Sequence, residues 1–340
     1  MKTITVTLAL ALGLSCGAAK AQEYTLKYSF ADVDQPAANA AAAHAYVFEE
    51  ALERLSGGRI EVDVFPNGQL GDARSMAQQV RRGTIDVASF SSGVFASLYY
   101  PELGIIDLPF LYATRADMVE KLSTHQPFIA ELLDDVAEST GVRILGFEPY
   151  GFRNFTTADT PIQRPEDIQG LKMRTQEIVP HQELMRALGA SPTPIPFLEL
   201  YSALQTGVVD GEENPLATIQ QQKFYQVQNH LTLSGHLMTI AAIFVNEAWY
   251  AGLPDDLRAA VDQANAEASL AYAGVGATQD VLALDQLEEE GMTIYALSPE
   301  ERQAFRDATA KPLREWAIDE YGDEFAQGFF DYLDSFDKAP

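Results

Sequence analysis

Residues 59–65 read RIEVDVF, in which apolar and polar side chains alternate strictly. This alternation is typical of a β-strand that buries one face. Segments 24–30 and 85–90 are two further predicted strands, and segments 38–55 and 72–82 have the apolar spacing of helices. The order strand, helix, strand, helix, strand predicts a parallel or mixed sheet that is covered by helices.

A related order of segments returns in the second half of the chain. Segment 171–175, LKMRT, is a predicted strand, and segments 180–188 and 198–205 are predicted helices. The second helix leads into GVVD at 207–210, which has the same Gly-x-x-Asp spacing as GTID at 83–86. This repeated corner between helix and strand suggests two lobes of similar construction.

Long helices are expected in the last third of the chain. Segment 247–290 has almost no Pro after Pro254 and is rich in Ala, Asp, Glu and Gln, which predicts a long helix that spans both lobes. Segment 299–336 is amphipathic with aromatic side chains at helical spacing, so we expect these side chains to pack in the core. The chain is therefore predicted to have an α/β fold of two lobes, with mixed sheets flanked by helices.

The composition excludes several classes of protein. The chain of 340 residues has 23 Lys and Arg against 49 Asp and Glu, a formal net charge of −26. Such a balance opposes binding to nucleic acid or to anionic lipid, because both need basic patches. The single Cys excludes a disulfide framework and a Cys-rich metal site. The 47% of hydrophobic residues is ordinary for a globular protein.

The N-terminus has the features of a secretory signal peptide. Lys2 precedes the uncharged segment 3–14, and small residues occupy the −3 and −1 positions of a cleavage site after Ala21. We expect cleavage between Ala21 and Gln22 and a location in the periplasm. A lipoprotein anchored through Cys16 and a buried first strand are the two alternatives. No later segment reaches the roughly 18 apolar residues that a membrane helix needs.

Motifs of common enzymes are absent from the sequence. It has no nucleophile elbow, P-loop or dinucleotide fingerprint, and its five His are scattered. No cofactor and no metal are expected. Asp210, Glu212 and Glu213 form an acidic cluster that could supply a general base or a cation site, although a solvated loop is the favoured interpretation. An exported enzyme that uses this cluster is the alternative to a binding protein.

Arg174 is the first candidate for a binding role. It lies near the end of the predicted strand 171–175, and ligands of open α/β sheets bind beyond the carboxyl ends of strands. A guanidinium group matches a carboxylate with two parallel hydrogen bonds. From this spacing alone, an internal ion pair with Asp or Glu is the favoured interpretation. Arg153 has the same two interpretations.

The order and spacing of several motifs resemble those of DctP-type solute-binding proteins of tripartite ATP-independent periplasmic (TRAP) transporters. The motifs are LGD at 70–72, GTID at 83–86, YPE at 100–102, LPF at 108–110, GLKMR at 170–174, GASPTP at 189–194, ELYSALQTGVVDG at 199–211 and ENPL at 213–216. The resemblance covers essentially the whole chain after the leader. It implies a type II periplasmic-binding-protein-like fold, in which two α/β lobes are joined by crossovers and a long helix and close over an organic acid.

The resemblance also implies roles for individual residues. Arg174 matches the arginine that clamps the ligand carboxylate in this family, and Arg153 matches a second arginine. Phe197 matches an aromatic or apolar wall of the site, and Asn214 matches an amide that contacts the ligand.

The first lobe and the crossover are expected to contribute further contacts. Ser91 and Ser92 fall where the first lobe meets the ligand, and relatives that bind sialic acid have a glutamate at the position of Ser92. The absence of this glutamate argues against sialic acid. It predicts tolerance of a ligand with a second acidic group, or of a ligand smaller than a nine-carbon sugar acid. Asp32 and His44 are expected to face the cleft. For each of them, contact with the ligand and no contact are equally expected. For His236, ligand contact and a structural hydrogen bond are equally expected.

The resemblance implies a periplasmic receptor that delivers a small carboxylate to the membrane subunits of a TRAP transporter. The ligand is left open between a sugar acid, a C4-dicarboxylate, a 2-oxo acid and an aromatic acid. A receptor for an ABC-type importer and a sensor are further alternatives. We expect residues 22–149 and about 237–277 to form the first lobe, and residues 150–236 and about 278–340 to form the second.

Overall fold

A mixed sheet of nine strands forms the centre of the computed structural model, which describes residues 22–336. The predicted leader and Cys16 lie outside this range. In chain order the strands are β1 (Tyr24–Phe30), β2 (Ile60–Phe65), β3 (Val87–Ser91), β4 (Val142–Thr157), β5 (Lys172–Thr175), β6 (Ser191–Pro194), β7 (Gly211–Pro215), β8 (His230–Asn246) and β9 (Thr293–Ala296). Eight of them lie in the order β2-β1-β3-β8-β4-β7-β5-β6, and β9 pairs with β8.

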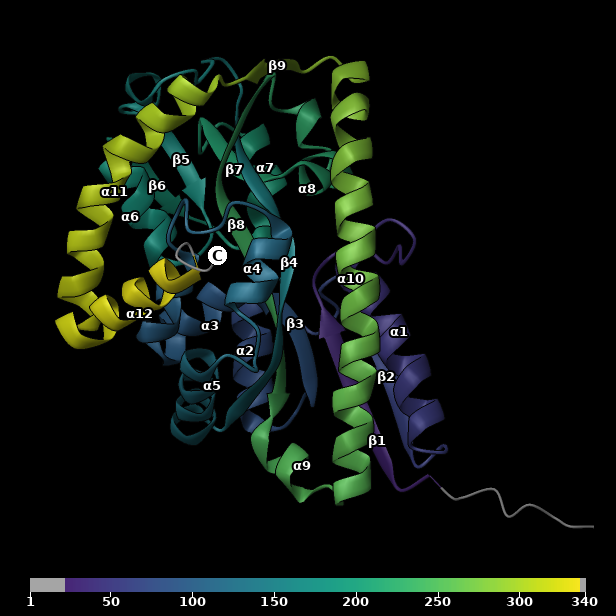
Figure 1. Ribbon diagram of the computed structural model, residues 1–340. Helices are drawn as coiled ribbons and strands as arrows, with labels where there is room; N and C mark the ends of the chain where they lie inside the picture. The colour runs from purple at the N-terminus through teal and green to yellow at the C-terminus, as the bar shows by residue number, and fades with distance from the viewer. Residues whose placement is uncertain (1–21, 337–340) are drawn as a thin grey trace, which may run out of the picture.

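Helices flank this sheet (Figure 1). The α-helices are α1 (Ala40–Leu55), α2 (Ala73–Arg82), α3 (Ser92–Tyr99), α4 (Arg115–Lys121), α5 (Pro127–Thr140), α6 (Val179–Ala187), α7 (Leu200–Gln205), α8 (Leu216–Gln221), α9 (Glu247–Gly252), α10 (Asp255–Glu289), α11 (Pro299–Tyr321) and α12 (Asp323–Phe336). Short 3₁₀ helices are η1 (Pro101–Asp107), η2 (Pro165–Ile168), η3 (Phe197–Glu199) and η4 (Phe224–Gln226).

The sheet has two halves that meet at two long strands. β1 pairs in parallel with β2 and β3, and β5 pairs in parallel with β6 and β7. β4 and β8 pair antiparallel with each other, while β8 also pairs with β3 and β4 with β7. In Figure 1 the first group of strands lies at the bottom and the second group at the top. The predicted two-lobed α/β fold, with a mixed sheet flanked by helices, is confirmed.

The long strands β4 and β8 are absent from the strands predicted from the sequence. β4 contains residues that usually end a strand, since Gly146, Pro149 and Gly151 lie within its 16 residues. Its register against β8 shifts at three places. Such irregularities bend a strand without ending it. β4 therefore continues from one lobe into the other.

Helix α10 confirms the predicted long helix. It has 35 residues and runs beside the sheet from one lobe to the other (Figure 1). The predicted shorter helices begin and end close to the predicted residues because local signals fix their ends. At the start of α2, the Asp72 side chain accepts a hydrogen bond from the backbone of Ser75, and Gly83 ends this helix with a φ of 70°.

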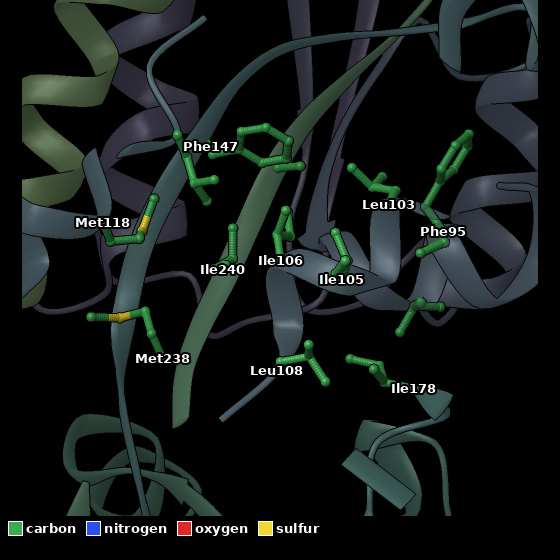
Figure 2. Packing of buried hydrophobic residues seen from close by; sticks show 14 of the residues in the cluster. Phe95, Leu103, Ile105, Ile106, Leu108, Met118, Phe147, Ile178, Met238 and Ile240 are labelled. Carbon is green, nitrogen blue, oxygen red and sulfur yellow. The ribbon is translucent and has the colours of Figure 1, made fainter. Parts of the chain in front are cut away.

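The largest hydrophobic core lies where the long strands pass between the lobes. Figure 2 shows Phe147 of β4 together with Met238 and Ile240 of β8, near Ile105 and Ile106 of η1. All five side chains are buried. Because burial of apolar surface stabilises the folded chain, this shared core holds the lobes together at the crossover.

The C-terminal helices contact both halves of the molecule. Phe329 of α12 is buried, and its ring centroid lies 5.9 Å from that of Phe128 in α5, while α11 contacts α6. The predicted packing role of the C-terminal aromatic residues is confirmed. The residue boundaries of the two lobes stay a prediction. In the part of the chain that the structure describes, no helix is both long enough and apolar enough to cross a membrane.

Candidate functional site

A cavity of about 80 Å³ lies between the two halves of the sheet. The predicted site residues that line it are Asp32, Ser91, Arg153, Phe197 and Asn214. The other four predicted residues are absent from its lining, namely His44, Ser92, Arg174 and His236. The cavity is also lined by residues that the sequence analysis missed, among them Tyr150, Gln176, Thr218 and Tyr272.

Arg153 of β4 is buried, and most of its N–H groups donate hydrogen bonds to other residues of the protein. Its Nε and Nη2 donate to the carboxylate of Glu213, Nη2 also donates to the Glu213 backbone oxygen, and Nη1 donates to Thr239 Oγ1 at 2.9 Å. For Arg153, the internal ion pair considered from the sequence is therefore present. An arginine has five N–H donors, so about one remains to face a ligand in the cavity.

Glu213 and His236 form the support behind Arg153. His236 Nε2 lies 3.5 Å from Glu213 Oε2, and its Nδ1 lies 2.7 Å from Ser234 Oγ. Burial would raise the pKa of Glu213, but the charge of Arg153 and the nearby His236 hold it below its usual range. The ring of His236 also stacks on Phe155, with centroids 4.1 Å apart. Of the two roles expected for His236, these contacts favour the structural one.

Arg174 of β5 has a different environment. Its Nε and Nη2 donate to the backbone oxygen of Ile195 at 3.0 and 2.8 Å. Its side chain is 1% exposed, and Nη1 has no hydrogen-bond partner among the described residues. No carboxylate of residues 22–336 lies within 4.0 Å of it, so the internal ion pair favoured from the sequence is wrong for Arg174. Burial, together with the like charge of Arg153, lowers the pKa of Arg174 to about 10.

The acidic cluster is not a solvated loop. Glu212 and Glu213 are fully buried on β7, and only Asp210 is exposed. The Glu212 carboxyl accepts hydrogen bonds from Thr156 Oγ1 at 2.6 Å and from the Asn214 side chain, and burial raises its pKa to about 7. The expectation failed because an Asp- and Glu-rich segment is usually exposed, whereas here Arg153 and hydroxyl groups offset the burial. Within residues 22–336, no group of three or more His, Cys, Asp or Glu is placed to hold a metal ion.

Other residues of the cavity lining carry oxygen atoms instead of cations. Tyr150 donates a hydrogen bond to Asp32 Oδ1 at 2.5 Å, and Thr218 Oγ1 lies 3.4 Å from the Tyr150 hydroxyl. The Tyr272 hydroxyl of α10 is buried without a hydrogen-bond partner among the described residues. Burial raises the pKa of Asp32. Donors and acceptors of this kind match the hydroxyl groups of a ligand.

The two serines after β3 have different surroundings. Ser91 lines the cavity and its Oγ lies 3.2 Å from the Gln176 side-chain nitrogen. Ser92 is fully buried, and its Oγ lies 3.1 Å from both Asp107 Oδ2 and the Ile240 backbone oxygen. The prediction that Ser92 faces the ligand, and the tolerance inferred from it, therefore lack support in the structure.

His44 belongs to the core under the cavity. It is fully buried on α1, and its Nδ1 lies 3.0 Å from the Tyr28 hydroxyl. Its ring stacks on Phe48, with centroids 6.0 Å apart. These contacts give His44 a packing role, whereas Asp32, the other residue expected on this side, does line the cavity.

A cavity that lies between two lobes and is lined by a few polar side chains is a common setting for a small-molecule site. Residues 30–319 match the family model described as bacterial extracellular solute-binding protein, family 7, DctP. The chain belongs to this family.

Relatives and solved structures agree with this family. The chain is 34% identical over 261 residues to the C4-dicarboxylate-binding periplasmic protein DctP of Rhodobacter capsulatus, covering 76% of this chain and 77% of the relative. It superposes with a TM-score of 0.84 and 31% identity on the sugar acid binding protein DctPAm from Advenella mimigardefordensis in complex with galactonate, covering 92% of this chain and 99% of that chain. A TRAP periplasmic solute binding protein from Sulfurospirillum deleyianum with bound succinate gives a TM-score of 0.81 and 30% identity, over 91% and 99% of the two chains.

Proposed function

We propose that the protein binds a small organic acid in the periplasm and delivers it to the membrane subunits of a TRAP transporter. The observation that carries this proposal is Arg174, a buried arginine whose Nη1 has no partner among residues 22–336. A charged group without a counter-ion is costly to bury, so an incoming carboxylate would relieve this cost. The similar structures that contain galactonate and succinate support a carboxylate as the ligand.

The ligand carboxylate is proposed to lie between Arg153 and Arg174. Arg153 lines the cavity and retains about one free donor, whereas Arg174 lies outside the present lining. Binding therefore requires a small rearrangement that brings Nη1 of Arg174 to the cavity. The resulting pair of hydrogen bonds would act in a buried site, where a charged pair discriminates strongly between ligands.

The oxygen-bearing residues of the cavity lining favour a hydroxylated acid with a single carboxylate. Asp32 and Tyr150 can accept from and donate to ligand hydroxyl groups. A second ligand carboxylate would meet Asp32, and two like charges at close range are unfavourable. We therefore place the ligand among sugar acids and related hydroxy acids, in preference to C4-dicarboxylates.

Binding without turnover is the function that we propose. The acidic residues that an enzyme on this fold would use, Glu212 and Glu213, are held by Thr156, Asn214 and Arg153. They are fully buried and do not line the cavity, so neither is placed to exchange a proton with a ligand there.

Calorimetric titration with two four-carbon acids tests the ligand class. D-Erythronate has one carboxylate and three hydroxyl groups, whereas succinate has two carboxylates. We expect D-erythronate to bind at least about tenfold more tightly, a difference of about 1.4 kcal/mol. The variant Asp32→Asn, which can still accept from Tyr150, should reduce this preference. Tighter binding of succinate by the wild-type protein would contradict the proposed ligand class, and release of a reaction product from either acid would contradict binding without turnover.

A further inference from the structure

A second cavity, of about 530 Å³, lies where helix α10 passes strand β4. It shares no lining residue with the organic-acid cavity. Its walls come from β4 at 145–149, from the segment 122–125 before α5, and from one side of α10. The function described above does not use this cavity.

Glu148 of β4 is the buried charged group of this second cavity, whereas Asp262 of α10 lines it at an exposed position. Its side chain is 3% exposed, and its Oε1 accepts a hydrogen bond from Ser269 of α10 at 2.5 Å. No Arg, Lys or His of the described chain forms an ion pair with it. Burial raises the pKa of Glu148 to about 7. A carboxylate in this position lacks the counter-charge that buried charges usually have.

The rest of the cavity combines the exposed carboxylate of Asp262 with an amide and apolar walls. Asn265 of α10 also lines the cavity, where its Nδ2 donates to the Leu145 backbone oxygen at 3.4 Å, and its amide lies beside His44 of the core. Leu145 and Leu270 lie in the walls, and Leu270 remains 77% exposed. An exposed leucine at the edge of a cavity offers apolar surface to a ligand.

We propose that this cavity is a binding site for a small organic cation, a primary ammonium group on a short alkyl chain. An ammonium group has three N–H donors and no acceptor, which matches the buried carboxylate of Glu148. The alkyl chain would cover Leu145 and Leu270. The net charge of −26 attracts cations to the protein surface in general, and the single buried carboxylate provides the specific contact.

Calorimetric titration with n-butylammonium chloride at pH 8 tests this site on the whole protein, with sodium chloride and n-butanol as matched probes. We expect saturable binding of n-butylammonium alone. Glu148→Gln, which keeps an acceptor for Ser269, should weaken binding at least tenfold. Asp285→Asn removes one negative charge from an exposed position of α10 outside the cavity and should leave the affinity unchanged.

A second variant keeps the test decisive if Glu148→Gln does not fold. Leu270→Lys places a cation at the exposed wall of the cavity and should also abolish binding of n-butylammonium. The proposal is overturned if n-butylammonium shows no saturable binding. It is also overturned if Glu148→Gln or Leu270→Lys binds as the wild-type protein does, because the cation would then be bound elsewhere, for instance at Asp32.

Discussion

Arg174 is buried, and its Nη1 is free of protein partners within residues 22–336. We predict that Arg174→Ala lowers the affinity for D-erythronate at least about 100-fold, because removing one partner of a buried charge pair costs about 2–5 kcal/mol. Arg174→Lys should fail almost as badly, since the single nitrogen of an ammonium group cannot contact Ile195 on one side and the ligand on the other, as the planar guanidinium group does. Calorimetric titration measures both losses.

A matched control for Arg174 lies on the next helix. Arg186→Ala removes a half-exposed arginine of α6 that pairs with Glu183, and it should leave the affinity unchanged. The variant Arg174→Ala should still show a cooperative unfolding transition, because Arg174 has no carboxylate partner to lose. Wild-type affinity in Arg174→Ala would remove this residue from the site.

Ser92 leads to a prediction about stability instead of binding. A glutamate at this position would place a second carboxyl group beside Asp107 in space that is already filled. We expect Ser92→Glu to lower the free energy of unfolding by about 3 kcal/mol or more. Urea denaturation measures this loss, and Ser91→Ala, at the partly exposed neighbour, is the control. A Ser92→Glu variant of normal stability that no longer binds the acid would restore Ser92 to the ligand site.

At the scale of single residues, the sequence predicts side chains within motifs better than side chains from distant segments. Arg153, Phe197 and Asn214 belong to local motifs and do line the cavity. Tyr150 and Tyr272 lie more than 100 residues apart, and only the crossing of β4 and α10 brings them together. No local pattern of the sequence indicates that Tyr150 and Tyr272 lie side by side.

Gly151 of β4 lies at a crowded point of the crossover. An added Cβ there would lie 2.7 Å from the Pro215 Cβ and 3.1 Å from the side chains of Arg115 and Asp280, whose ion pair joins α4 to α10. We predict that Gly151→Ala lowers the free energy of unfolding by about 1–3 kcal/mol, as overpacking does in other cores. Thermal unfolding followed by circular dichroism measures the change.

The control for Gly151 is a glycine with space around it. An added Cβ at Gly274 in α10 meets nothing within 4 Å. Gly274→Ala should therefore raise the stability slightly, because alanine favours a helix more than glycine does. Equal stability of Gly151→Ala and the wild-type protein would show that β4 and β7 can separate at this point without cost.

At the scale of elements, the helices whose ends are marked by capping residues were predictable from the sequence. The long strands that cross between the lobes were not. Helix α2 begins after the capping residue Asp72 and ends at Gly83, and both residue types indicate helix ends in a sequence. β4 contains Gly146 and Pro149, which resemble a strand end, and only its pairing with β8 keeps it extended. Long-range pairing of this kind overrides local preference.

Three buried carboxyl groups make the stability of the whole molecule depend on pH. Burial raises the pKa of Asp107, Glu148 and Glu212 to about 7, while such groups titrate near 4 in an unfolded chain. The folded state therefore holds their protons more tightly. Their contribution to stability is complete below about pH 4 and is lost as the pH rises through 7.

We predict a lower free energy of unfolding at pH 8 than at pH 5.5. Glu213, whose pKa is lowered, affects stability only at more acidic pH, where its contribution is lost as the pH falls. Glu148→Gln should reduce the loss between pH 5.5 and pH 8 by about 2 kcal/mol, whereas Asp285→Asn should not. Urea denaturation at the two pH values decides this, and an equal loss in Glu148→Gln and the wild-type protein would contradict the raised pKa of Glu148.

We propose that the carboxylate of the ligand lies between Arg153 and Arg174, with the hydroxyl groups of the ligand toward Asp32. A crystal structure of the protein with D-erythronate tests it most directly. We expect a carboxylate oxygen within hydrogen-bond distance of Arg174 Nη1 and a ligand hydroxyl at Asp32. A carboxylate placed beside Asp32, or an Arg174 that still contacts only Ile195, would contradict it.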